Sequence, residues 1–268
     1  MSGPIGIGIC TFNRPEMLEK CGKAIIRNLF VDGKPVFDYL LVYNDGSDKK
    51  HHGSYERAYR PLRSAGATII DAPENGGVAV AKNALIESLL ARGCDWIFTL
   101  EDDLLLKDPK AVTEYVAVAE RRGLSHFSFY NHGPANISGP VEVDGDIAYY
   151  PHSIGAWCLY SREMINKVGM FDTGMVNAFE HVEFEMRAFS MGYAPNGGPH
   201  RFADVVGSEN WLTEIPGAIE KSSIRPRSDW QSNIRNSLLY WRDNKPETYD
   251  LLFGPEMPLH AYAQSIIG

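Results

Sequence analysis

Three consecutive carboxylates, Glu101, Asp102 and Asp103, follow the apolar run WIFTL at residues 96–100. An apolar run of this length that ends in charge is typical of a strand buried on both faces of a sheet. Adjacent carboxylates repel one another, and Mg²⁺ or Mn²⁺ relieves that repulsion while it also binds substrate phosphates. Open α/β sheets bind ligands at the carboxyl ends of their strands, so this stretch predicts a metal–diphosphate site. The alternative is a solvated acidic turn.

Polar turns follow three earlier apolar runs in the same way. Residues 5–10 lead into TFNRP at 11–15, residues 39–43 into NDGSD at 44–48, and residues 67–70 into a stretch that contains NGGVAVAKN at 75–83. A Gly pair before a helix lets a phosphate approach the backbone, and Lys82 supplies a neutralising cation. Asn13 is a candidate cap for a helix that has Pro15 in its first turn. Three βα units of this kind predict a parallel sheet with one functional edge.

The chain after residue 103 is less regular. The pattern predicts a helix over 109–122, a strand over 124–130 and a hairpin over 141–150 that turns at Asp144 and Gly145. Ser161 is a candidate cap for the next helix. A further helix begins near residue 179 and places Glu180 and Glu183 on one face.

The tail from residue 204 onward is distinct. An irregular basic loop holds Lys221, Arg225 and Arg227, and we hypothesise that it folds over a donor diphosphate as a lid. Ser228 is the predicted cap of a helix that Pro246 ends. Four apolar side chains form one stripe along this helix: Trp230, Ile234, Leu238 and Trp241. We expect the stripe to pack on the core rather than to bind an acceptor.

The bulk composition indicates a globular α/β protein. The 268 residues suffice for one large domain or two small ones, with 44% apolar and 22% charged residues and a formal net charge of -8. The negative charge argues against a general nucleic-acid or anionic-membrane binder. Four widely spaced cysteines and a strand-like start without a leader favour reduced thiols in a cytoplasmic protein. No apolar run reaches transmembrane length.

Four motifs together resemble the GT-A fold nucleotide-sugar glycosyltransferases, especially family 2 and the related polypeptide N-acetylgalactosaminyltransferases. They are TFNRP at 11–15, NDGS at 44–47, LEDD at 100–103 and FEHVEF at 179–184, and the resemblance covers residues 5–205. It implies a Rossmann-like, mostly parallel central sheet flanked by helices. It also implies a domain over 1–205, with a nucleotide-binding half (1–103) and a mixed acceptor-side half (104–205). Residues 206–268 would be an extension whose amphipathic helix packs on that domain.

The resemblance also assigns roles to residues of the first half. Thr11, Asn13, Arg14 and Asp45 would hold the nucleobase and ribose, and Lys82 would lie near the base or diphosphate. Glu101 and Asp102 would contact the donor. Asp103 would be the main Mn²⁺ or Mg²⁺ ligand, with Glu101 as a further ligand or a ribose contact. His200 resembles a late histidine that completes the metal site in some members; the alternative for it is a structural loop histidine.

The late acidic motif departs from the family pattern. Inverting relatives carry Asp as base where His181 stands here, and histidine can act as a base near neutral pH. The spacing of Glu180 and Glu183 instead resembles the retaining N-acetylgalactosaminyltransferases, so the stereochemistry stays open. We assign Glu180 to acceptor or sugar binding, His181 to the base, and Glu183 to the same catalytic group. A helix with a solvated acidic face is the alternative.

The leading hypothesis is a metal-dependent glycosyltransferase that uses a nucleotide-diphosphate sugar, with uridine as the expected base. A non-catalytic sugar-nucleotide or partner-binding module is the alternative. A sugar-phosphate nucleotidyltransferase fits less well, because TFNRP lacks the Gly-rich loop with Arg and Lys that such enzymes need. The acceptor stays open among a glycan, a protein, a metabolite and a modified nucleobase, and the net charge argues against DNA.

Overall fold

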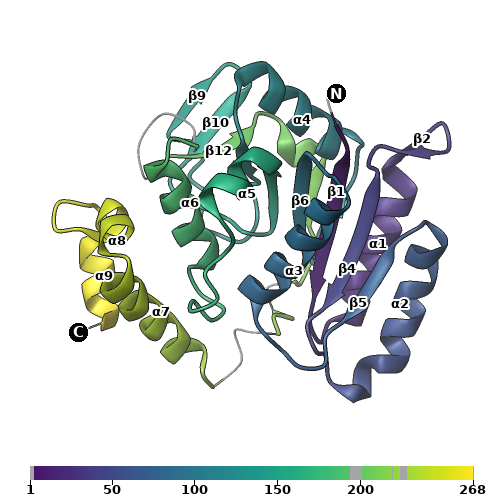
Figure 1. The fold of residues 1–268 in the computed structure, drawn as a ribbon, viewed down its shortest axis with the longest axis horizontal. Coiled ribbons are helices and arrows are strands. Elements are labelled where there is room, and N and C mark those ends of the chain that lie inside the picture. Colours follow the sequence, from purple (N-terminus) through teal and green to yellow (C-terminus); the bar gives the residue numbers. More distant parts are fainter. Residues whose placement is uncertain (1–2, 194–200, 219, 224–227, 268) are drawn as a thin grey trace.

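A computed structural model describes residues 3–193, 201–218, 220–223 and 228–267. Its central six-stranded sheet has the order β5-β4-β1-β6-β11-β8. The strands are β1 (Ile5–Thr11), β4 (Tyr39–Asn44), β5 (Thr68–Asp71), β6 (Trp96–Glu101), β8 (His126–Ser128) and β11 (Trp157–Ser161). The first four are parallel, whereas β11 runs antiparallel to both β6 and β8. The mostly parallel sheet predicted from the sequence is confirmed (Figure 1).

Strand β1 shows why the sequence forms this core. Ile5, Ile7 and Ile9 alternate and are buried in the cluster on one face of the sheet. The intervening glycines leave room for a helix on the other face, since a Cβ at Gly8 would lie 2.9 Å from Leu85 Cβ. The alternating pattern IGIGI therefore explains both why this segment forms a strand with one apolar face and why a helix packs closely on its other face.

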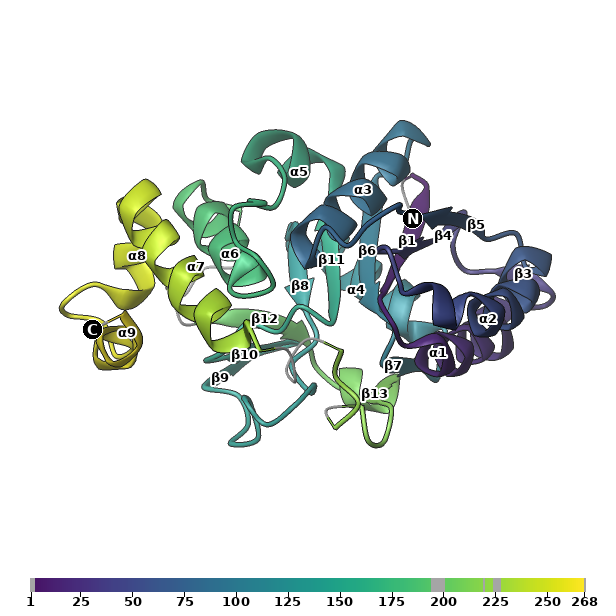
Figure 2. The ribbon, with the colours of Figure 1, turned by 90° about the horizontal axis from the view of Figure 1, so that it is seen from below.

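Helices cover both faces of the sheet (Figure 2). On one face the core includes side chains from α1 (Pro15–Asn28), α2 (His52–Ser64) and α4 (Lys110–Arg122). On the other it includes α3 (Val78–Ala91), α5 (Arg162–Val168) and α6 (Glu180–Ser190). Ser161 caps α5 as predicted, because its hydroxyl accepts from the Met164 amide at 3.1 Å. Asn13 does not cap α1: the N-cap is Arg14, and Asn13 instead bonds the backbone and side chain of Asp48.

Three small sheets complete the α/β part. β9 (Glu142–Asp144) and β10 (Ile147–Tyr150) form the predicted hairpin, which turns at Gly145 with φ of 62°, and β12 (Phe202–Val205) joins them. β2 (Phe30–Val31) pairs with β3 (Lys34–Pro35). β7 (Leu104–Leu106) pairs with β13 (Leu212–Glu214). This last pairing fastens the chain beyond residue 205 directly to the strand that follows the acidic motif.

Three C-terminal helices pack beside α6 at one end of the molecule (Figures 1 and 2). They are α7 (Trp230–Asn244), α8 (Pro246–Phe253) and α9 (His260–Ile267), and they share a separate apolar cluster with Met186 of α6. The N-cap of α7 is Asp229 rather than the predicted Ser228, and Pro246 begins α8 immediately after α7. Among the described residues, no helix has both the length and the apolarity to cross a bilayer.

Candidate active site

The strand register gathers the polar turns at one edge of the sheet. Thr11 lies beside Asn44, and Cys10 lies beside Glu101, so the turns after β1, β4 and β6 meet. Because β8 is antiparallel to β11, and β11 to β6, the turn after β8 reaches the same edge. This is the edge at which parallel α/β sheets bind ligands.

Two connected pockets open along this edge. The strand-edge pocket, of about 50 Å³, is lined by Thr11, Asp45, Asn75 and Glu101 among others. The central pocket, of about 450 Å³, is lined by residues that include Asp103, His132, Glu180 and His181. Both linings include Arg14, Val78, Glu101, Asn177 and Ser223. One elongated ligand can therefore extend from the first pocket into the second.

Asp45, which lines the strand-edge pocket, accepts three hydrogen bonds from the turn before α3. Its Oδ1 accepts from the Gly76 amide at 2.9 Å, and its Oδ2 accepts from the Gly77 amide at 2.9 Å and from Asn75 Nδ2 at 2.7 Å. Burial raises the pKa of Asp45, and the two amide bonds oppose that rise. A carboxylate offers about four acceptor positions, so a lone pair remains for a ligand N–H or hydroxyl.

The acidic motif is tied to the first turn by Arg14. The guanidinium lies 2.5 Å from Asp102 Oδ1 and 2.9 Å from Asp103 Oδ2, and Thr11 donates to Asp102 Oδ2 at 2.5 Å. The Asp102 side chain is fully buried and belongs to neither pocket lining, unlike Glu101 and Asp103. Burial raises the pKa of Asp102 despite Arg14. Asp102 is thus placed to position Thr11 and Arg14, not to face the predicted donor.

His132 is a pocket residue that the sequence interpretation missed. Its Nε2 lies 3.3 Å from Asp103 Oδ1 and 3.9 Å from Glu214 Oε2. Burial favours the neutral forms of both partners, but pairing outweighs it: the pKa of Asp103 lies below its ordinary value and that of His132 above. The sequence could have indicated this residue, because His132 lies in the polar turn after an apolar strand, as Asp45 and Asp103 do.

Asn177 is a second missed residue, and it has no such signal. It lies in a turn, with φ of 56°, and its Oδ1 accepts from the Val78 amide at 3.1 Å. This bond links the start of α3 to the segment before α6 across 99 residues of sequence. Its position therefore depends on tertiary packing that sequence spacing does not reveal.

Lys82 lies behind the pocket lining and contacts residues that form it. Its side chain is fully buried, and its ammonium donates to the Gly155 carbonyl at 2.9 Å and lies 3.6 Å from Glu101 Oε1. A Cβ on Gly155 would lie 2.8 Å from that ammonium and 3.2 Å from the His181 ring, so a larger residue there would displace the ammonium. Lys82 belongs to neither pocket lining. It instead pairs with Glu101, which lines both pockets.

Glu180 and His181 begin α6 and face the central pocket. His181 Nδ1 lies 3.3 Å from Glu180 Oε1. Burial opposes ionisation of Glu180, but the bond with His181 and the charges of His181 and Lys82 outweigh it, so the pKa of Glu180 is lowered. Phe179, just before them, has φ of 64°, a conformation that costs an aromatic residue about 1–3 kcal/mol. Such strain is typical of segments that position functional side chains.

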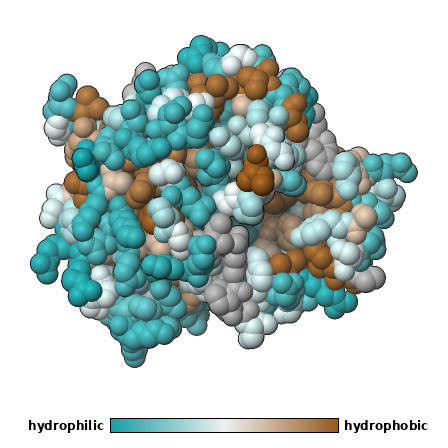
Figure 3. All heavy atoms as spheres, turned by 180° about the vertical axis from the view of Figure 1, so that it is seen from behind, coloured by the Kyte–Doolittle hydropathy of each residue, from teal (hydrophilic) through white to brown (hydrophobic). Residues whose placement is uncertain are grey.

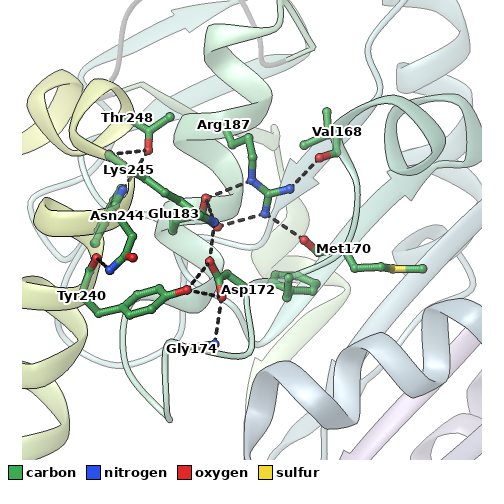
Figure 4. Close-up of polar contacts among 12 residues, drawn as sticks. Val168, Met170, Asp172, Gly174, Glu183, Arg187, Tyr240, Asn244, Lys245 and Thr248 are labelled. Carbon is green, nitrogen blue, oxygen red and sulfur yellow. Dashed lines mark hydrogen bonds and ion pairs between the residues drawn. The ribbon is translucent and has the colours of Figure 1, made fainter.

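Glu183, predicted to act with them, points elsewhere. Its side chain is fully buried, and both of its oxygens accept from Arg187 at 2.9 Å. Lys245 of the C-terminal helices lies 2.8 Å from Glu183 Oε1 and 2.5 Å from Asp172 Oδ2 (Figure 4). Glu183 is outside both pocket linings. In this structure it joins α6 to the C-terminal helices.

A divalent cation fits the donor set at the central pocket. Asp103 and Glu101 line the pocket, and the buried Asp103 Oδ1, although it lies 3.3 Å from His132 Nε2, makes no well-aligned hydrogen bond. Carboxylate oxygens of this kind suit Mg²⁺ or Mn²⁺, which complete their coordination with phosphates and water. The described residues contain no preformed group of three or more His, Cys, Asp or Glu side chains arranged around a metal. His200, the third predicted ligand, lies outside the described residues, as do Arg225 and Arg227 of the hypothesised lid.

Comparisons with known proteins bear on the fold and the family. Residues 7–138, just under half of the chain, match the sequence profile of Glycosyl transferase family 2. A search of curated proteins found no match.

Solved structures with the same fold include the mannosyltransferase PcManGT from Pyrobaculum calidifontis in complex with GDP-Man and Mn²⁺. It is 15% identical, has a TM-score of 0.52, and the match covers 72% of this chain and 54% of that one. They also include S. aureus TarS (10%, TM-score 0.56, 92% and 41% covered) and TarS 1–349 in complex with UDP-GlcNAc (12%, 0.55, 98% and 70%). The chain thus spans about half the length of the first two relatives or less. Residues 7–138 therefore match a glycosyl transferase family 2 domain, and the chain has the GT-A fold of these solved structures.

Proposed function

We propose that the chain transfers a sugar from a nucleotide-diphosphate donor, with uridine as the base, to a hydroxyl acceptor. The single observation that carries this proposal is the pair of connected pockets at the carboxyl edge of the sheet. One end presents Asp45 and the turn at Thr11, and the other presents Asp103, Glu180 and His181. The polar groups at the first end can bind the base edge or ribose of a nucleoside that extends from the central pocket, and a diphosphate–metal unit suits the second end.

The residues divide the chemical work as follows. Asp45 accepts from the base or ribose, and Arg14 faces the diphosphate. Asp103 and Glu101 would hold Mn²⁺ or Mg²⁺, which neutralises the leaving diphosphate. The acceptor hydroxyl oxygen bonds to the anomeric carbon as the bond from that carbon to the diphosphate oxygen breaks. The diphosphate leaves with the bonding electrons, and His181 receives the hydroxyl proton, with Glu180 stabilising its charge.

Thermal unfolding with a panel of UDP, GDP, CDP and ADP, with and without Mn²⁺, tests the donor site. A ligand at a hundred times its Kd stabilises the native state by about 2.7 kcal/mol, which is a shift of about 5–10 °C for a chain of this size. We expect UDP with Mn²⁺ to give such a shift and Asp103→Asn to abolish the metal-dependent part.

Asp250→Asn, at an exposed carboxyl on α8, is the matched control and should leave the shift intact. A shift from another diphosphate would revise the base. If no diphosphate stabilised the protein, the donor-site assignment would be wrong, and the non-catalytic alternative would gain support.

A further inference from the structure

A third concavity adjoins the central pocket, and its walls are mainly apolar. This apolar groove, of about 540 Å³, lies between α6, β12 and the three C-terminal helices. Six of its lining side chains are Phe179, Phe202, Trp230, Ile234, Leu252 and Leu259. Figure 3 shows brown and tan atoms gathered in a hollow on the side of the molecule where the C-terminal helices lie.

Helix α7 contributes side chains both to the C-terminal apolar cluster and to the groove. Leu238 and Trp241 are fully buried in the C-terminal cluster, as the sequence analysis expected of the whole stripe. Trp230 and Ile234, the first half of the same stripe, are only half-buried and line the groove. The stripe therefore continues past the core into an open concavity, and concave apolar surface of this kind is typical of a ligand site.

The groove and the central pocket are continuous. Both linings include Ala135, Asn177, Glu180, His181 and Trp230. A molecule that fills the groove therefore ends at Glu180 and His181, where the transfer is proposed to occur. Because the donor is proposed to occupy the strand-edge and central pockets, a molecule that reaches the same point from the groove would be the acceptor.

The charges at the groove identify the acceptor class. Its lining contains no Lys or Arg among the described residues, and it includes the ionised Glu180. An anionic acceptor would bring its charge toward Glu180, whose partner in the groove lining is the His181 ring at 3.3 Å rather than a Lys or Arg, at a cost in binding. A neutral hydroxyl group suits the polar end, and an aliphatic chain suits the apolar walls.

We propose that the apolar groove binds the acceptor, and that the acceptor is a neutral amphiphile with a hydroxyl-bearing head and an aliphatic tail. This inference rests on the proposed transferase function. The head lies at Glu180 and His181 in the central pocket, and the tail lies along Ile234 and Leu259. Burial of the tail fixes the hydroxyl near the base and adds affinity with each methylene that leaves water.

Binding of methyl, butyl and octyl glucoside to the full chain, below their critical micelle concentrations, tests the groove by titration calorimetry. A fully buried methylene lowers the Kd about fourfold, so burial of about half of the seven methylenes that octyl adds to methyl glucoside should tighten binding on the order of a hundredfold. With a sugar donor built on the nucleoside diphosphate that thermal shift selects, mass spectrometry should detect octyl glucoside extended by one sugar.

Two variants locate the binding. Ile234→Glu places a charge in the groove, and Ile234→Ala removes apolar surface without one; we expect at least tenfold weaker octyl glucoside binding from the first and a smaller loss from the second. The control is Val206→Glu, at a valine that is 44% exposed and outside the groove lining, which should leave the Kd unchanged. All three should keep the diphosphate-dependent thermal shift.

Three results would overturn the groove assignment. They are equal affinities for methyl and octyl glucoside, an equal loss of binding in Val206→Glu, and a dimer in sedimentation that octyl glucoside dissociates, since a second copy would then fill the groove. A missing diphosphate shift with intact chain-length dependence would instead reject the proposed donor while the groove stood.

Discussion

Arg14 is the residue on which the acidic motif depends. It is 15% exposed and pairs with Asp102, which is fully buried, and with Asp103. Removing one partner of a buried ion pair leaves an uncompensated charge and costs about 3–5 kcal/mol. We predict that Arg14→Ala lowers the free energy of unfolding by that amount in urea denaturation. Arg14→Lys should lose less, since it keeps the charge but not the two-pronged geometry.

Arg63→Ala is the matched control for this prediction. Arg63 also pairs with a carboxylate, Glu56, but both side chains are exposed, so its removal should leave the urea midpoint nearly unchanged. Equal midpoints for the Arg14 and Arg63 variants would mean that the buried network adds nothing to stability.

Individual residues also show which parts of the site could be predicted from the sequence. Thr11, Asp45, Glu101 and Asp103 line the pockets because polar residues after buried parallel strands must meet at one edge. This rule does not predict whether a charged side chain faces the pocket or is buried against the protein. Asp102 has the same local setting as its neighbours, yet it is fully buried against Arg14.

The same limit explains Lys82 and Glu183. Each is a charged side chain near a predicted ligand, and each is fully buried against a partner distant in the sequence: Gly155 for Lys82 and Lys245 for Glu183. A pattern of residue types predicts that such a charge has a partner but not whether that partner is a ligand or the protein itself.

At the scale of elements, α6 is the link between the site and the C-terminal helices. Its first turn carries Glu180 and His181, and Glu183 one turn later meets Lys245 at the end of α7. Lys245 also pairs with Asp172, which accepts from Tyr240 (Figure 4). The sequence predicted both helices, but only tertiary packing shows that ion pairs join them.

This junction should make stability depend on pH. Burial tends to raise the pKa of Asp172, but the bond and charge of Lys245 outweigh it and lower the pKa below its ordinary value of 3.8. A lowered pKa in the folded state stabilises the fold above the ordinary pKa, and this stabilisation is lost as the pH falls through the folded value. Asp172→Asn should therefore lower the Tm at pH 7, and the difference from the parent should shrink below about pH 4.

The Tm of both proteins, measured from pH 7 to pH 3, checks this. Asp250→Asn is again the control and should show no Tm deficit at any pH. A deficit in Asp172→Asn that stayed constant down to pH 3 would show that the ionised carboxylate does not stabilise the junction.

At the scale of the whole molecule, two apolar clusters pack on opposite faces of one sheet and a third lies apart. The first two both include buried side chains of β4, β6 and β11, so these strands connect them. The third consists of α7–α9 with residues such as Met186 and Phe202, and among the described residues it includes none from the six-stranded sheet. The fold class could be predicted from the pattern of the strands. The separate cluster could not, because an apolar stripe on one helix does not indicate which element it packs against.

This arrangement predicts that the C-terminal helices unfold before the sheet does. Leu238 is fully buried in the third cluster, so Leu238→Ala should cost about 2–5 kcal/mol there. In amide hydrogen exchange we expect faster exchange across α7–α9 with unchanged protection in β1 and β6. Leu100→Ala, the same change at a fully buried position of β6, should instead weaken protection throughout.

An equal loss of protection across the chain in Leu238→Ala would contradict this prediction and make the molecule one cooperative unit. The distinction has a functional consequence. If the helices open alone, the groove wall at Ile234 and Leu259 is lost while Asp45 and Asp103 keep their positions. Leu238→Ala should then weaken octyl glucoside binding and leave the diphosphate-dependent thermal shift in place, because the donor pockets stand on the sheet and the groove depends on the helices.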